Sequence, residues 1–122
     1  MIISRRLAER IPLRSSSFHA TWLSDWLKVD ERGVLADISL GGFSGRMAQA
    51  PAKGHLLHAR LSLRIGSDQD TPLPIELDAR ICGRTPGAGQ DNWIVHCAIE
   101  TIHPADQKRM IQTIETHQQG RL

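Results

Sequence analysis

The alternation of apolar and polar residues along 55–65 is the strongest constraint on how this chain folds. His58, Arg60, Ser62 and Arg64 separate the apolar positions, so an extended strand would have one apolar face and one polar face. A helix cannot sort these residues in that way, because its side chains repeat with a period close to 3.6. The segment therefore predicts a half-buried β-strand with Leu57, Ala59, Leu61, Leu63 and Ile65 facing inward.

The same period returns twice in the second half of the chain. It covers residues 73–81 and 93–99, and the stretch between them, 85–92, is rich in residues that form tight turns. This pattern predicts a pair of strands joined by a hairpin loop. Their inward residues would be Leu73, Ile75, Leu77, Ala79 and Ile81 in the first strand, and Trp93, Val95, Cys97 and Ile99 in the second.

A shorter strand is indicated earlier, where Val34, Ala36 and Ile38 would share the core-facing side and Gly41-Gly42 would end the strand. The residues after it, 43–54, suggest another short strand and a loop. Many short strands with glycine and proline turns favour a barrel or a sandwich over alternating strands and helices. We expect a mainly all-β fold, an antiparallel barrel of about six strands over residues 15–102.

The period changes to that of a helix near the end of the chain, over residues 104–119. Met110, Ile111 and Ile114 stand at helical spacing, and Pro104 suits a first helical turn. Asp106 would complement the positive end of the helix dipole. We expect a C-terminal amphipathic helix that packs on the barrel.

The length and the net charge of the chain indicate a single domain and disfavour a nucleic-acid-binding protein. With 122 residues, the chain has the size of one domain, 1–122. A net charge of +2 is small for a protein that coats nucleic acid, and three Trp, two Phe and no Tyr make a poor platform for stacking bases. We expect no nucleic-acid partner.

The chain also carries no signal for a membrane or for secretion. No apolar run approaches the roughly 18 residues that span a bilayer, and arginines interrupt the start of the sequence. Cys82 and Cys97 lack the spacing of a redox or metal motif, so we interpret both as reduced, packed thiols. The three tryptophans are interpreted as packing residues. We expect a cytoplasmic protein without membrane insertion.

Two short motifs carry recognisable chemistry. Residues 1–14 form a basic arm, which we expect to be mobile, and it contains the pattern RxxxR from Arg6 to Arg10. The second motif, DxSxxG, runs from Asp37 to Gly42. In a strand the carboxylate and the hydroxyl of DxS leave the same face, so the barrel would present them side by side on its outer surface, opposite Ala36 and Ile38.

This pair of motifs, with a basic arm, about six strands and a C-terminal helix, resembles the PilZ domain family. The resemblance covers nearly the whole chain and implies binding of cyclic di-GMP as a ligand, with no cofactor and no catalytic step. A receptor of this kind would order its arginine arm on the ligand and signal to a downstream protein that the sequence does not identify. The residues that the resemblance assigns to the ligand are Arg5, Arg6, Arg10, Asp37, Ser39, Gly41 and Gly42.

The chemistry of these residues suits such a ligand. Guanidinium groups of Arg6 and Arg10 can meet phosphate oxygens, or guanine O6 and N7, with two hydrogen bonds each. Asp37 can accept from guanine N1–H and the exocyclic amine, and Ser39 can donate to a phosphate or base acceptor. Gly41 and Gly42 would allow a sharp turn and a close backbone approach.

Arg5 bears on how many ligands bind. In the family that the chain resembles, an arginine directly before RxxxR accompanies a stacked ligand dimer, and a bulky apolar residue accompanies a monomer. A guanidinium can also stack on guanine. We therefore expect two cyclic di-GMP molecules per chain.

Other interpretations remain open at this stage. The arginines can be a solvated basic terminus, and residues 37–42 can be an ordinary strand-to-turn transition. A metal site is disfavoured, since His55 and His58 would face opposite sides of a strand. The main functional alternative is a PilZ-like adaptor that binds a protein without nucleotide, and a second is a small RNA- or DNA-binding barrel. No catalytic motif supports an enzyme.

Overall fold

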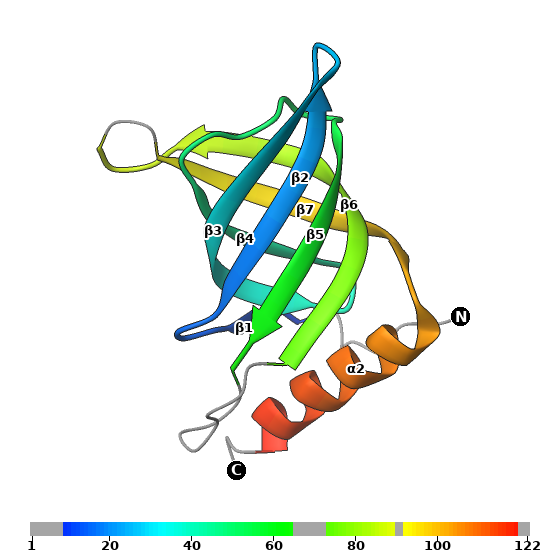
Figure 1. Ribbon diagram of the computed structural model, residues 1–122. Helices are drawn as coiled ribbons and strands as arrows, with labels where there is room; N and C mark the ends of the chain where they lie inside the picture. Colours follow the sequence, from blue (N-terminus) through cyan, green and yellow to red (C-terminus); the bar gives the residue numbers. More distant parts are fainter. Residues whose placement is uncertain (1–8, 65–72, 90–91, 120–122) are drawn as a thin grey trace.

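The computed structural model describes residues 9–64, 73–89 and 92–119, and it places them in a barrel with a helix beneath it (Figure 1). Most of the described chain is extended, as the alternation predicted. The elements in chain order are β1 (Ile11–Pro12), β2 (Ser17–Ser24), β3 (Leu27–Ser39), β4 (Gly42–Met47), β5 (Leu56–Leu63), β6 (Leu73–Pro86), β7 (Trp93–Ile102) and α2 (Pro104–Gln119).

Six of these strands close into an antiparallel barrel, and β1 is an additional short strand that pairs with β3. The order is β1-β3-β2-β5-β6-β7-β4, and a further pairing of β3 with β4 completes the ring. Closure leaves no free edge among the six strands, so each of them has two hydrogen-bonded neighbours. The expected six-stranded barrel with a C-terminal helix is confirmed.

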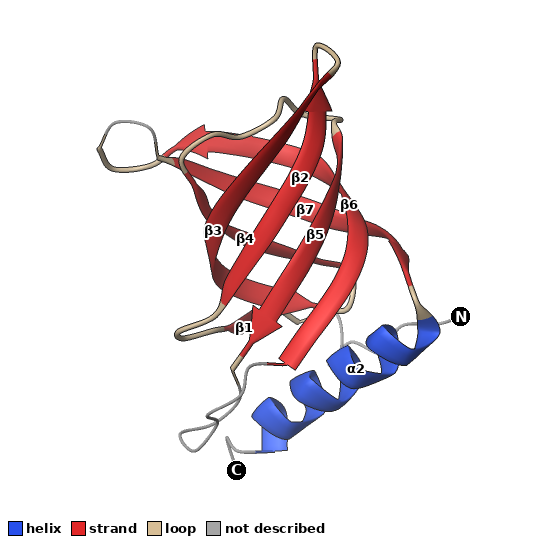
Figure 2. Cartoon of the chain, in the orientation of Figure 1, coloured by secondary structure: helices blue, strands red, loops and turns tan. Residues whose placement is uncertain are grey.

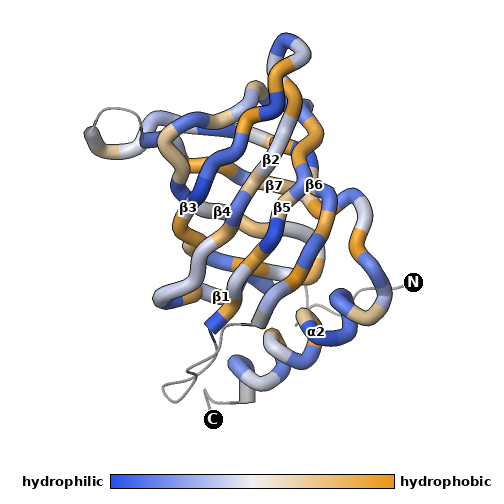
Figure 3. The backbone as a smooth tube through the Cα atoms, in the orientation of Figure 1, coloured by the Kyte–Doolittle hydropathy of each residue, from blue (hydrophilic) through white to orange (hydrophobic). Residues whose placement is uncertain are grey.

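The core fills the barrel with side chains that the alternation predicted, among them Leu57, Ala59, Leu61 and Leu63 of β5, whereas Ile65 lies outside the described residues. Figure 3 shows hydrophobic and hydrophilic residues alternating along β5 and β6. The rings of Phe18 and Phe43 pack at a centroid distance of 5.6 Å, within the range of favourable aromatic pairs. Helix α2 lies across one end of the barrel (Figure 2) and buries Met110 and Ile114, which closes that end of the core.

The face assignment of β3 was only partly right. Ile38 is fully buried, but Val34 is 60% exposed and Ala36 is exposed as well. The cause is an irregularity in the β3–β4 pairing, where the register passes from Leu35 directly to Asp37 and leaves Ala36 without a partner. The bulge moves the inward position from Val34 to Leu35 and restores the predicted face at Ile38.

Part of the predicted basic arm belongs to the folded barrel. Ile11 and Pro12 form β1, which pairs with Ile38 and Asp37 of β3, and the Ile11 side chain is only 1% exposed. The backbone N–H of Leu13 donates to the carbonyl of Ala36 at 2.9 Å, so the bulge provides the acceptor that extends this pairing. The arm therefore reaches the barrel earlier than residue 14, directly beside the DxSxxG motif.

The β2–β3 hairpin places one predicted packing residue in solvent. Its two turn residues, Asp25 and Trp26, have φ angles of 50° and 71°, as the tight turn that suits twisted strands requires. Trp26 is 97% exposed, whereas Trp22 is buried as predicted and Trp93 is partly buried against the core. Two positive φ angles point the turn side chains away from the barrel.

The two cysteines also differ from each other. Cys97 is buried, and its burial raises the pKa of the thiol to about 12. Cys82 is exposed, in contrast to the prediction of a packed thiol, because it lies at the register shift between Ile81 and Gly83 in the β6–β7 pairing. A bulge again overrides a simple count of alternating positions.

Candidate ligand-binding site

The last arginine of RxxxR contacts the DxSxxG motif at the junction of β1, β3 and β4. Arg10 comes directly before β1, and a guanidinium nitrogen donates to Asp37 Oδ1 at 2.9 Å. The two residues are 27 positions apart, and the antiparallel pairing of Ile11 with Ile38 brings them together. Their side chains are 46% and 30% exposed, so the pair lies at the surface where a ligand can reach it.

Ser44 holds the other oxygen of the same carboxylate. Its hydroxyl donates to Asp37 Oδ2 at 2.6 Å, and the two residues face each other across the β3–β4 pairing. The sequence reasoning missed Ser44. The signal was present in the hairpin: a two-residue turn at 40–41 pairs Ser39 with Gly42, and counting back from that pair places Ser44 opposite Asp37.

Ser39 lies beside Asp37 but differs from its expected position. It is 4% exposed, so it is not presented on the outer surface. Its hydroxyl faces the carbonyl of Gly42 at 3.5 Å, the long limit of a hydrogen bond. In this arrangement Ser39 spans the β3–β4 turn, and a ligand would have to enter that turn to reach it.

The two glycines of the motif serve different purposes. A Cβ on Gly42 would lie 2.2 Å from the carbonyl oxygen of Cys97, so only glycine fits against β7 there. A Cβ on Gly41 would meet nothing within 4 Å, and its carbonyl accepts from the N–H of Ile99 at 2.9 Å. Gly42 is thus required by packing, and Gly41 offers an open surface at the turn.

Two further polar side chains extend this surface. His96 faces Ser44 across the β4–β7 pairing and is exposed. Arg46 follows Ser44 by two positions on the same strand face, and it is exposed too. Arg10 contacts Asp37, and Arg46 and His96 add exposed groups near Ser44 that can donate hydrogen bonds to an anion or a base.

Arg5 and Arg6, the other two predicted arginines, lie outside the described residues.

Across the parts of the chain that the structure describes, no three His, Cys, Asp or Glu side chains gather closely enough to hold a metal ion. The one helix among the same residues, α2, is neither long enough nor apolar enough to cross a membrane.

Comparisons with solved structures find the same fold in other proteins. The Bacillus subtilis inhibitor of motility MotI/DgrA has a TM-score of 0.68 at 16% identity, and the match covers 98% of this chain and 54% of that one. Escherichia coli YcgR in complex with c-di-GMP has a TM-score of 0.66 at 18% identity, with 98% and 48% covered. This chain therefore spans about half the length of those two proteins.

A separate structure holds only the PilZ domain of Escherichia coli YcgR with c-di-GMP. It matches at a TM-score of 0.60 and 18% identity over 97% of this chain and 95% of that one. At these identities the likeness establishes the fold. No curated protein matches the sequence significantly.

The sequence itself matches the model of a domain family. That model, the PilZ domain, aligns with residues 4–116, which include both motifs, all seven strands and most of α2. The barrel, the helix beneath it and the contact of Arg10 with Asp37 agree with this match. The chain therefore belongs to the PilZ domain family.

Proposed function

We propose that this protein is a receptor for cyclic di-GMP that binds the ligand at the β1–β3–β4 junction. The observation that carries the proposal is the contact at 2.9 Å between Arg10, the last residue of RxxxR, and Asp37, the first residue of DxSxxG. YcgR is described in complex with c-di-GMP, and its PilZ domain shares this fold. The proposed role is that of a receptor, with no chemical step.

Binding would replace the Arg10–Asp37 ion pair with contacts to the ligand. A pair this exposed contributes at most about 1 kcal/mol, so a ligand can separate it at little cost. Arg10 would turn to a phosphate or to guanine O6 and N7. Asp37, still held by Ser44, would accept from guanine N1–H and the exocyclic amine.

The remaining arginines of the arm complete the proposal. Arg5 and Arg6 would close over the ligand, and the free energy of binding would be coupled to the ordering of the arm. The surface formed in this way would be read by a downstream protein. Two stacked ligands would bring four phosphates together, and three neighbouring arginines can reduce their mutual repulsion.

Calorimetric titration tests the proposal directly. Cyclic di-GMP should bind with saturation, while GTP and a random oligonucleotide should not. Absence of binding at cyclic di-GMP concentrations up to about 100 µM would leave the nucleotide-independent adaptor as the better account.

The same titration tests the stoichiometry separately. We expect two ligands per wild-type chain and one per Arg5→Leu chain, at a fixed ionic strength because the charge contribution depends on salt. A wild-type ratio of one would refute the role of Arg5 and leave the receptor proposal standing.

A further inference from the structure

The tip of the β2–β3 hairpin exposes more apolar surface than its turn requires. Figure 1 shows this hairpin projecting beyond the rest of the barrel. Trp26 is 97% exposed at the tip, and the flanking Leu23 and Leu27 are 64% and 71% exposed. A φ of 71° is costly for a bulky residue, and the turn would form more easily with glycine in that position. An exposed indole on a strained backbone points to a contact outside the chain.

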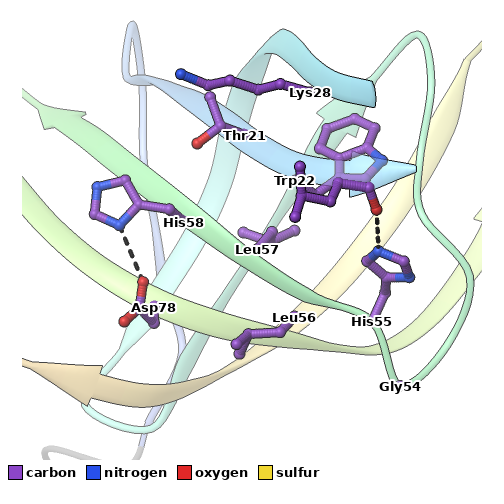
Figure 4. Close-up of a pocket in the computed structure, with 10 residues that line it drawn as sticks. Thr21, Trp22, Lys28, Gly54, His55, Leu56, Leu57, His58 and Asp78 are labelled. Carbon is purple, nitrogen blue, oxygen red and sulfur yellow. Dashed lines mark hydrogen bonds and ion pairs between the residues drawn. The ribbon is translucent and has the colours of Figure 1, made fainter. Parts of the chain in front are cut away.

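An open, mainly apolar groove lies directly beside this tip. Figure 4 shows its walls, which come from β2, β3, β5, the loop before β5 and Asp78 of β6, and its volume is about 610 Å³. A hydrogen bond of 2.9 Å between His55 Nε2 and the carbonyl of Leu23 fixes one wall to the hairpin. The side chains that line the groove include Trp22, Leu23, Lys28, Leu56 and Leu57.

The hairpin tip and the groove form one patch that contains both a projection and a hollow. In a dimer with two-fold symmetry the same patch faces itself, so residue i of one copy meets residue j of the other in both directions. The projecting indole of each copy then enters the groove of its partner. A volume of about 610 Å³ exceeds the size of an indole, so the groove has room for it.

The charges of the patch agree with this arrangement. Asp25 precedes Trp26 in the turn and is exposed, and Lys28 lines the groove. Because Asp25 adjoins Trp26 and Lys28 lines the groove, seating Trp26 in the facing groove would bring Asp25 toward the Lys28 of the other copy. The symmetry repeats the contact, so each dimer gains two pairs of opposite charge.

We propose that this chain self-associates through the β2–β3 hairpin, with Trp26 of each copy seated in the groove of the other. The patch lies at the opposite end of β3 from Asp37, so this interface and the proposed cyclic di-GMP site are independent. A patch of a few side chains is small beside stable interfaces, and we therefore expect a weak dimer that forms in the range of tens to hundreds of µM, roughly.

Sedimentation equilibrium over about 5 µM to 1 mM protein tests the proposal. The wild type should pass from monomer to dimer, and Trp26→Gly should stay a monomer throughout. Glycine suits the φ of this turn, so the variant should fold normally, which circular dichroism would verify. Val34→Ser alters another exposed apolar residue on β3 and should dimerise like the wild type.

A charge exchange distinguishes this dimer from association by another surface. Asp25→Lys alone and Lys28→Asp alone should each weaken the dimer about fivefold or more. The double variant, Asp25→Lys with Lys28→Asp, restores opposite charges across the interface and should regain most of the affinity. A double variant as weak as the single ones would contradict the seating of Asp25 at Lys28.

Three results overturn the proposal. The first is a wild type that remains monomeric at the highest concentration, and the second is a Trp26→Gly variant that dimerises normally. The third is binding of the wild type, but not of Trp26→Gly, to anionic lipid vesicles without any self-association, which would assign the tip to a membrane surface instead.

Discussion

The two ends of β3 differ in what they expose. At its C-terminal end Asp37 is held by two partners, Arg10 and Ser44, and the surrounding side chains are polar. At its N-terminal end the turn exposes Trp26 between two leucines, and the backbone adopts positive φ angles to do so. At the polar end hydrogen bonds already fix the orientation of Asp37, whereas at the apolar end large side chains are exposed to solvent.

This difference separates two kinds of recognition on one strand. Preformed hydrogen bonds from Arg10 and Ser44 hold the Asp37 carboxylate in place, so the proposed binding of cyclic di-GMP would exchange existing contacts for new ones. Burial drives recognition at the Trp26 end, which needs a complementary hollow. Roughly 35 Å of strand lies between residues 26 and 37, at about 3.3 Å per residue, so changes at one end should leave the other intact.

The largest effect is expected between the two ends, on the stability of the barrel. Ile38→Ala removes a fully buried side chain and should lower the free energy of unfolding by about 2–5 kcal/mol. Val34→Ala, at a position predicted to share its face, should change it by less than about 0.5 kcal/mol. Urea denaturation measures both, and equal losses would mean that the bulge at Ala36 is absent. The folded fraction of Ile38→Ala should still bind cyclic di-GMP.

The next largest effect is on affinity at the polar end. Arg6→Ala or Arg10→Ala should weaken cyclic di-GMP binding at least about 30-fold, or about 2 kcal/mol, because each removes a charge-assisted contact. Arg14→Ala removes an exposed arginine outside the motif and serves as the matched control. Calorimetry gives the three affinities. Unchanged affinities for both motif variants would show that the arginine arm does not contact the ligand.

A smaller loss of affinity is expected when the support of Asp37 is removed. Ser44→Ala deletes the 2.6 Å hydrogen bond to Oδ2, so the carboxylate is less well oriented toward guanine. We expect binding to weaken by about 5–10-fold, near 1 kcal/mol. Ser17→Ala, at an exposed serine of β2, should leave the affinity unchanged. If Ser44→Ala bound cyclic di-GMP as tightly as the control, the hydrogen bond from Ser44 would not be needed to orient Asp37 for binding.

The smallest effect is a gain in stability at the apolar end. Trp26→Gly relieves the strain of a bulky residue at positive φ and should raise the free energy of unfolding by up to about 1 kcal/mol. Urea denaturation at low protein concentration, where self-association is absent, measures this. A clear loss of stability would show that Trp26 packs within its own chain. Ligand affinity should not change in this variant.

The sequence predicted the parts of the fold that depend on period and on turn chemistry. Strand β5 and the helix over Pro104–Gln119 follow directly from apolar spacing, because one side of each must be buried. The segments predicted as strands account for five of the six barrel strands, and β2 (Ser17–Ser24) had no segment of its own. These features are local, because each strand or helix can be recognised from a stretch of about a dozen residues.

The features that escaped prediction depend on contacts between distant segments. Val34, Ala36 and Ile38 are apolar residues at alternate positions, so nothing local indicates the bulge, where the Ala36 carbonyl accepts from the N–H of Leu13, just after β1. The contact of Arg10 with Asp37 was suggested by the family resemblance, but its geometry needed the β1–β3 pairing. Trp26 was misassigned because large apolar residues are usually buried, and only the turn geometry reveals its exposure.

The most direct test of the account is to map cyclic di-GMP onto the protein by NMR. In a titration of ¹⁵N-labelled protein, the largest shifts of backbone amide signals should fall on Arg10, on residues 37–44 and on His96. The amides of Asp25 and Trp26 should remain unchanged at a protein concentration that keeps the chain monomeric. Shifts concentrated at the β2–β3 hairpin or its groove, with the Asp37 end unaffected, would contradict the central claim that the ligand binds where the two motifs meet.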